Sequence, residues 1–167
     1  RQMCIRDRKK REARVKTFDD LLIELYERLR GDPADAESRA QAERLAESIR
    51  SAFSVVLVDE FQDTDPIQYA VIRRIFLRKR EPHPVWFVGD PKQAIYRFRG
   101  ADLETYLRAR RDVEALYQTA GSGRFRGVYA LTTNYRSSPD LVRAFNAFWR
   151  TAPNPFLRED LAYLEVE

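Results

Sequence analysis

The fold is decided by the stretch VVLVDEFQDTDPIQY at residues 55–69, together with VWFV at residues 85–88. The first four residues form a continuous apolar run rich in β-branched side chains, which is typical of a strand buried on both faces. Asp65-Pro66 offers an N-cap and a first helical residue, and the pattern predicts a helix to about Arg80. A strand, a helix and a second strand predict a βαβ unit with a parallel sheet. We therefore expect an α/β fold with a parallel sheet and flanking helices.

Helical patterns lie on both sides of this unit. Thr17-Phe18-Asp19-Asp20 has the form of a capping box, and apolar residues follow at helical spacing until Gly31. The same periodicity predicts three further helices, over Ser38–Ala52, Asp102–Gln118 and Ser138–Arg150. Val128–Thr133 is a candidate for a third strand.

The composition limits the chemistry that is available to the chain. Its 167 residues, 44% of them apolar and 34% charged, are enough for one domain with a real core. One Cys and one His cannot assemble a Cys/His metal cluster, which excludes zinc, haem and iron–sulfur sites. No apolar run approaches the roughly 18 residues that span a bilayer. The sequence therefore predicts a soluble, cytoplasmic protein with no membrane partner.

The net charge of +4 is unevenly distributed along the chain. Arg1–Lys16 carries eight basic and two acidic residues, so the remainder is slightly acidic. Basic chains often bind nucleic acid, but here the excess positive charge lies in the first 16 residues. Evidence for nucleic-acid binding must therefore come from individual segments of the chain.

The first eight residues differ from the rest of the chain. RQMCIRDR, residues 1–8, holds the one Met and the one Cys, and it resembles the translated end of a transposon sequencing adapter. We therefore interpret residues 1–8 as a sequencing scar. Residues 9–52 are predicted to be a helical segment that leads into the main domain, and residues 53–167 to be part of that domain. Because the chain begins with Arg, we expect it to be an internal fragment.

Carboxylates follow both predicted strands. Asp59 and Glu60 come directly after the first strand, and Gly89-Asp90 comes directly after the second. Ligands of open parallel sheets bind outside the carboxyl ends of the strands. One carboxylate there would hold Mg²⁺, and another would orient or activate an attacking water. The alternative, that Asp59 and Glu60 only cap or solvate a turn, stays open at this point.

Three blocks follow one another along the chain: VVLVDEFQDTDPIQY, then VWFVGDPKQAIYRFRGAD at residues 85–102, then LTTNYRSSPDLV at residues 131–142. They resemble motifs II, III and IV of superfamily 1 DNA helicases, the UvrD/Rep/RecB-like group. Within that group, TFDDLL at residues 17–22 and FLRE at residues 156–159 resemble the RecB-type helicase–nucleases. The resemblance covers Lys16 to the C-terminus. It implies a partial RecA-like P-loop NTPase domain, with residues 53–167 as the motor part.

The resemblance also implies roles for individual residues in binding and hydrolysing ATP. Asp59 would coordinate the Mg²⁺ of Mg-ATP, and Glu60 would polarise the water that attacks the γ-phosphate. Gln93 would hydrogen-bond near the γ-phosphate and sense whether it is present. Arg136 would supply a guanidinium to that phosphate, and Tyr135 would stack on the adenine.

The block at residues 85–102 also contains residues that are suited to binding DNA. Tyr96 and Phe98 alternate with Arg97 and Arg99, an arrangement that stacks bases and meets the phosphates of a single strand. Lys92–Arg111 carries six basic residues against two acidic ones. The alternative, that Tyr96 and Phe98 belong to the core, stays open here.

These expectations combine into one leading hypothesis. The chain would belong to an ATP-dependent 3′→5′ DNA helicase that acts with RecC- and RecD-like subunits on single- and double-stranded DNA in double-strand break repair. An AddA-type or UvrD-type helicase is a near alternative, and a non-catalytic DNA-binding or assembly module is a more distant one. The sequence contains no GxxxxGK[ST] phosphate loop. We therefore do not expect this chain to hydrolyse ATP by itself.

Overall fold

A computed structural model describes residues 8–10, 12–78, 83–119, 127–153, 155–156, 158 and 160–167. The chain divides into two compact units, the first made of Arg1–Asp59 and Thr64–Val88 and the second of Glu60–Asp63 and Gly89–Glu167. Of the segment interpreted as a scar, residues 1–7 lie outside the described residues. In the described part of the chain, no helix is both long and apolar enough to cross a membrane.

Two of the helices of the first unit begin where the sequence predicts, whereas the helix predicted to start at Ser38 begins two residues earlier, at Ala36. Helix α2 (Phe18–Arg30) starts at Thr17, whose side chain accepts from the Asp20 N–H, while the Asp20 side chain accepts from the Thr17 N–H. Helix α3 (Ala36–Ser51) starts at Asp35. Helix α4 (Pro66–Phe76) starts at a second capping box, formed by Asp65 and Gln68. These N-caps satisfy backbone donors that a helix leaves unpaired at its first turn.

Helix α4 is shorter than predicted. It ends at Phe76, because Leu77 leaves the helical conformation with a ψ of 65°. The prediction of a helix to about Arg80 was therefore wrong at Leu77 and Arg78, which are not helical, while residues 79–80 lie outside the described part of the chain.

The two strands form the parallel pair that the βαβ pattern predicts. Strand β1 (Val56–Val58) pairs with β2 (Val85–Phe87), and Leu57 lies opposite Trp86 in the register. The backbone N–H of Val88 donates to the Val58 carbonyl at 2.9 Å, which extends the pairing past the end of β2. This small parallel sheet with its helices is consistent with part of an α/β domain.

One expectation about this sheet was wrong. The strands are not buried on both faces, because Leu57 is 64% exposed and Trp86 is 54% exposed. Side chains on the other face, including Val56 and Val85, pack against the helices. A run of four apolar residues does not distinguish a strand covered on one face from a strand covered on both.

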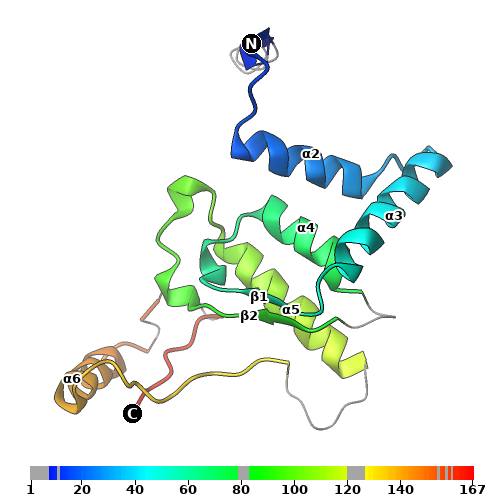
Figure 1. Cartoon of the computed structure of the whole chain (residues 1–167). Helices are drawn as coiled ribbons and strands as arrows, with labels where there is room; N and C mark the ends of the chain where they lie inside the picture. The colour runs from blue at the N-terminus through cyan, green and yellow to red at the C-terminus, as the bar shows by residue number, and fades with distance from the viewer. Residues whose placement is uncertain are drawn as a thin grey trace. The chain divides into compact units, whose positions relative to one another are not determined.

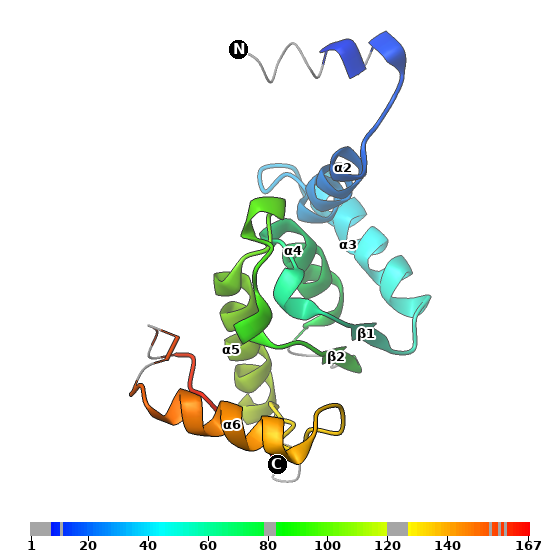
Figure 2. The ribbon, with the colours of Figure 1, turned by 90° about the vertical axis from the view of Figure 1, so that its left-hand side faces the viewer.

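The core of the first unit lies among helices α2, α3 and α4, whose arrangement Figure 1 shows. Its buried members are contributed by α2, α3 and α4: Leu29, Ala46, Val71, Ile75 and Phe76. Figure 2 shows α2 and α3 close to α4 from a second direction. Arg74 adds polar links from α4, since its Nε donates to the Leu29 carbonyl and a terminal nitrogen contacts Glu43 at 2.8 Å.

The second unit consists of short 3₁₀ turns and two longer helices. The turns are η1 (Phe61–Asp63), η2 (Pro91–Gln93) and η3 (Arg97–Arg99), and the helices are α5 (Leu103–Thr119) and α6 (Pro139–Arg150). Turn η1 packs on α5, with the ring centroids of Phe61 and Tyr106 5.9 Å apart. Helix α5 therefore supports the short segment that follows β1 in sequence.

The predicted third strand was wrong. Val128–Thr133 has no strand conformation. Two backbone bonds tie this region to Glu167: Asn134 N–H donates to the Glu167 carbonyl at 2.7 Å, and Glu167 N–H donates to the Thr132 carbonyl at 2.8 Å. A strand needs a neighbour over several residues, and pairing with one residue does not provide it.

Candidate functional site

The candidate site begins where β1 ends, with the carboxylates of Asp59 and Glu60. Asp59 directly follows the strand, and its side chain is exposed. Glu60 has a φ of 49°, in the left-handed region that residues with a side chain rarely adopt. Its carbonyl accepts from the Asp63 N–H at 2.9 Å, which closes the turn at η1. The backbone thus turns sharply at Glu60 and directs the chain into η1.

Gln62 links Glu60 to the loop after β2. Its amide Nε2 donates to Glu60 Oε2 at 2.6 Å, and its Oε1 accepts from the Asp90 backbone N–H at 3.0 Å. The residue is only 2% exposed. A buried amide needs partners for both its donor and its acceptor, and Gln62 has both. No role was predicted for this residue from the sequence.

Asp90 organises the loop that contains Gln93. Its Oδ1 accepts from the Lys92 N–H at 3.0 Å and contacts the Lys92 ammonium at 2.8 Å. Burial acts to raise the pKa of the Asp90 carboxyl, but the hydrogen bonds and charge of Lys92, together with the hydrogen bond from Gln93, hold the pKa below its ordinary value. Its Oδ2 accepts from Gln93 Nε2 at 3.2 Å. Asp90 is therefore a charged acceptor that fixes the η2 turn.

Glu60, Gln62, Asp90 and Gln93 together form what we call the Glu60–Gln93 network. The structure thus brings two residues with predicted roles, Glu60 and Gln93, into one series of hydrogen bonds. The other two members supply the links between them. All four residues belong to the second unit.

Gly89 is needed because the loop passes very close to this network. A Cβ on Gly89 would lie 2.5 Å from Gln62 Oε1 and 2.9 Å from the Phe61 backbone nitrogen. The Gly89 carbonyl also lies 3.4 Å from the Tyr106 hydroxyl of α5, which can donate to it. A side chain at residue 89 would therefore push the two segments apart.

We expect Gly89→Ala to destabilise this chain by about 1–3 kcal/mol, the usual cost of overpacking a filled site. Urea unfolding followed by circular dichroism measures the change. The same substitution in a Gln62→Ala background serves as the control, because removal of the Gln62 amide relieves the shorter contact. An equal cost in both backgrounds would show that Gly89 and Gln62 do not interact.

The two aromatic residues that follow Gln93 in the sequence, Tyr96 and Phe98, are on the surface. Phe98 is 78% exposed, and Tyr96 is also exposed, with the two ring centroids 5.9 Å apart. The alternative that both belong to the core is therefore wrong. Arg97 is exposed as well, whereas the side chain of Arg99 lies outside the described part of the chain.

Tyr135 and Arg136 lie on a turn before α6. Asn134 Oδ1 accepts from the backbone N–H groups of Arg136 and Ser137, at 2.9 Å and 3.0 Å. Tyr135 is 95% exposed, and Arg136 is exposed too. Within the described residues, the contacts of these two side chains do not bring them together with the Glu60–Gln93 network. Their predicted roles toward the nucleotide stay predictions.

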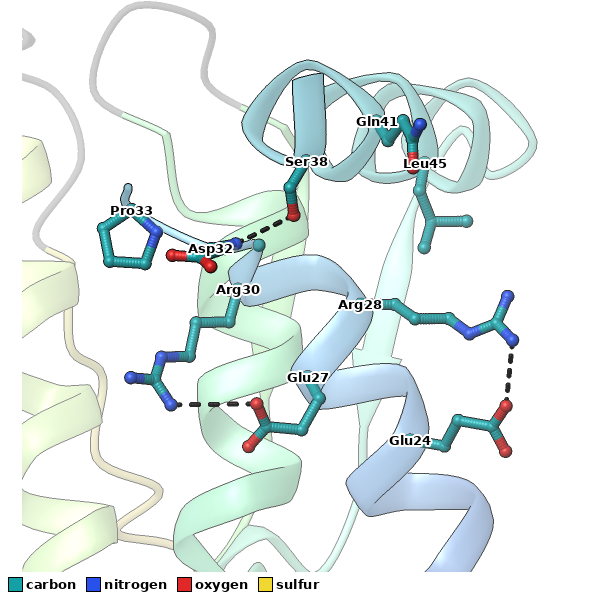
Figure 3. Close-up of a pocket in the computed structure, with 10 residues that line it drawn as sticks. Glu24, Glu27, Arg28, Arg30, Asp32, Pro33, Ser38, Gln41 and Leu45 are labelled. Atoms are coloured by element: carbon teal, nitrogen blue, oxygen red, sulfur yellow. Dashed lines mark hydrogen bonds and ion pairs between the residues drawn. The ribbon is translucent and has the colours of Figure 1, made fainter. Parts of the chain in front are cut away.

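A hollow in the first unit is not this site (Figure 3). It lies by α2, α3 and the connection between them, and no residue with a predicted role lines it. Four of its charged side chains are paired, Arg28 with Glu24 at 2.9 Å and Arg30 with Glu27 at 3.7 Å, and Asp32 accepts from the Ala34 backbone N–H at 2.9 Å. These pairs leave little uncompensated charge for a ligand.

The donor set at the end of β1 fits a magnesium ion that is held together with a nucleotide. Mg²⁺ in such sites takes one or two carboxylates, and phosphates and waters complete its shell. Asp59 offers one exposed carboxylate. Among the residues that the structure describes, no three His, Cys, Asp or Glu side chains form a cluster that could hold a metal ion without such help.

Comparison with known proteins gives a consistent result. The UvrD/REP helicase N-terminal domain family matches residues 4–114. The RecBCD enzyme subunit RecB of Escherichia coli K12 is 38% identical over 160 residues, which is 96% of this chain and 12% of that protein. The RecB subunits of Haemophilus influenzae and Mycobacterium tuberculosis are 39% and 40% identical, over 91% and 87% of the chain. The chain spans 11% of the length of each of these two.

Proposed function

Because the chain belongs to the UvrD/REP helicase family, we propose that it forms part of the motor of a RecB-like DNA helicase that acts in DNA repair. The observation that carries the proposal is the Glu60–Gln93 network. It joins a candidate water-activating carboxylate to a candidate phosphate-sensing amide. The exposed aromatic residues Tyr96 and Phe98 follow Gln93 in the same loop.

Each residue of the site has a chemical role in this proposal. Asp59 holds the Mg²⁺ of Mg-ATP, which supplies charge compensation to the phosphates. Glu60 accepts a proton from the attacking water and orients it. Gln93 donates to the γ-phosphate through its amide, and it loses that acceptor when the phosphate leaves. Arg136 stabilises the charge on the transferring phosphoryl group, and Tyr135 stacks on the adenine.

The remainder of the ATP site is proposed to come from other parts of a RecB-type subunit. The sequence holds no GxxxxGK[ST] loop, so another segment must bind the β- and γ-phosphates. The parallel pair β1 and β2, with α4 between them in sequence, is consistent with part of a RecA-like domain over residues 53–167. Residues 9–52 would lead into it.

The similarity to RecB subunits favours a RecB-type protein over AddA-type and UvrD-type helicases. The proposed partners are accordingly RecC- and RecD-like subunits and DNA. The proposed activity is 3′→5′ translocation on a single strand, driven by ATP hydrolysis, in double-strand break repair. A non-catalytic module is disfavoured because Asp59, Glu60, Gln93 and Arg136 are all of the residue types that the chemistry needs.

The experiment that tests this proposal uses a RecB-type subunit that carries this sequence. ATP hydrolysis is measured with and without single-stranded DNA, and unwinding is measured on duplexes with a 3′ or a 5′ single-stranded tail. We expect hydrolysis to depend on DNA and unwinding to require the 3′ tail. Hydrolysis that is independent of DNA, or unwinding from the 5′ tail, contradicts the proposed mechanism.

Tyr96→Ala and Phe98→Ala are each expected to weaken binding of single-stranded DNA about tenfold, because stacking on one base contributes about 1–3 kcal/mol. Fluorescence anisotropy at one fixed salt concentration measures the change, since affinity for nucleic acid depends strongly on salt. Phe18→Ala is the control, because Phe18 is exposed on α2, in the other unit. Unchanged affinity in both loop variants would refute the stacking role.

A further inference from the structure

We propose that Gln62 is a positioning residue that ties the Glu60 carboxylate to the loop Gly89–Gln93, so that the catalytic carboxylate responds to the state of that loop. The inference rests on the proposed function and deepens it. It adds a residue to which neither the motifs discussed above nor the predicted roles assign a part in hydrolysis.

Gln62 bonds to Glu60 and to the Gly89–Gln93 loop at the same time. Its Nε2 donates to Glu60 Oε2 at 2.6 Å, and its Oε1 accepts from the Asp90 N–H at 3.0 Å. An amide is suited to this position because it offers one donating and one accepting end. A carboxylate could only accept, and would add a negative charge beside Glu60.

The Gln62 side chain that forms this link has little freedom to move. Gln62 is 2% exposed and lies in η1, which packs on α5 through Phe61 and Tyr106. Gly89 approaches so closely that a Cβ there would lie 2.5 Å from Gln62 Oε1. Packed protein interiors transmit small displacements rather than absorb them. A shift of the Gly89–Gln93 loop is therefore passed to the Gln62 amide.

Gln62 also fixes the direction of the Glu60 side chain. The backbone of Glu60 has a φ of 49°, a conformation that residues with a side chain rarely adopt. The bond from Gln62 gives its carboxylate a fixed direction, which a general base needs because small misplacements of reacting groups slow the chemical step strongly. Within that loop, the Gln93 amide donates to Asp90 Oδ2 at 3.2 Å. Phosphate sensing at Gln93 and water activation at Glu60 are thereby connected.

The test measures steady-state ATP hydrolysis by a RecB-type subunit that carries this sequence, in complex with its partners. Gln62→Ala removes both bonds, and Gln62→Met removes both bonds while nearly keeping the side-chain volume. We expect each variant to lower kcat with DNA about 10- to 100-fold, with KM for ATP changed less than about threefold. The ratio of the rates with and without single-stranded DNA should fall as well.

Gln41→Ala is the matched control. Gln41 also donates from Nε2 to a glutamate, Glu37, at 3.2 Å, but on the exposed face of α3. The kcat of the Gln41→Ala variant should stay near that of the wild type. Thermal unfolding of all variants shows whether each is folded, and if Gln62→Ala does not fold, Gln62→Met decides the result.

Three outcomes overturn the inference. One is a kcat within about threefold of wild type in Gln62→Ala. Another is recovery of kcat in Gln62→Met, which would show that Gln62 only fills space. The third is a loss of activity that appears in KM alone. Failure of the proposed function gives a different result, because Glu60→Gln would then also keep its activity.

Discussion

Glu60→Gln in a RecB-type subunit that carries this sequence is expected to lower kcat for ATP hydrolysis by about 10²–10⁴-fold, the contribution of a positioned general base. An amide has almost the same shape as a carboxylate but cannot accept a proton from water. Nucleotide binding should be retained, because Asp59 and the phosphate contacts are untouched. Hydrolysis is measured by phosphate release, and binding by titration with a fluorescent ATP analogue.

The control for Glu60→Gln is Glu27→Gln, which makes the same chemical change on the exposed surface of α2. Its hydrolysis and unwinding should match the wild type. Retention of unwinding by Glu60→Gln would refute the assignment of Glu60 as the residue that activates water. Loss of nucleotide binding together with hydrolysis would indicate a structural role instead.

Arg136→Ala is expected to lower kcat about 10³-fold or more, the range found for guanidinium groups that stabilise a transferring phosphoryl group. Arg136→Lys should recover only a part of this loss, because an ammonium keeps the charge but loses the planar pair of donors. Single-turnover hydrolysis with saturating ATP measures the chemical step directly. The affinity for single-stranded DNA should change little.

Arg143→Ala is the matched control for Arg136, since Arg143 is an exposed arginine of α6, which follows the Arg136 turn in the same unit. A single-turnover rate for Arg136→Ala within about tenfold of wild type would contradict a transition-state role of the size expected. Because the structure leaves Arg136 exposed on its turn, this experiment is the direct test of whether it reaches the nucleotide.

The order of the main elements could be predicted from local chemistry. Thr17 and Asp65 mark helix starts because their side chains accept from backbone donors of the first turn. The apolar runs on either side of α4 predicted a parallel pair, and β1 and β2 form one. The length of α4 and the exposed face at Leu57 were not predicted, since both depend on what packs nearby rather than on the run itself.

The site was predictable where a motif, or the end of a predicted strand, marks its residues. Asp59, Glu60 and Gln93 were chosen by their order within blocks that resemble helicase motifs. Gln62 lay inside the same block, yet its importance depends on a partner 28 residues away, the backbone of Asp90. Sequence spacing carries no signal for such a contact. The requirement that a buried amide satisfy both of its ends becomes visible only when its burial is known.

The left-handed backbone of Glu60 has a consequence for how this position responds to selection. A positive φ costs a residue with a side chain about 1–3 kcal/mol, whereas glycine adopts it readily. The backbone conformation alone would therefore favour glycine at residue 60, while the buried Gln62 amide and the proposed chemistry both require a carboxylate there. The bond to Gln62 thus offsets part of the cost of the strained backbone, and a glycine that relieved the strain would leave a buried donor without its acceptor.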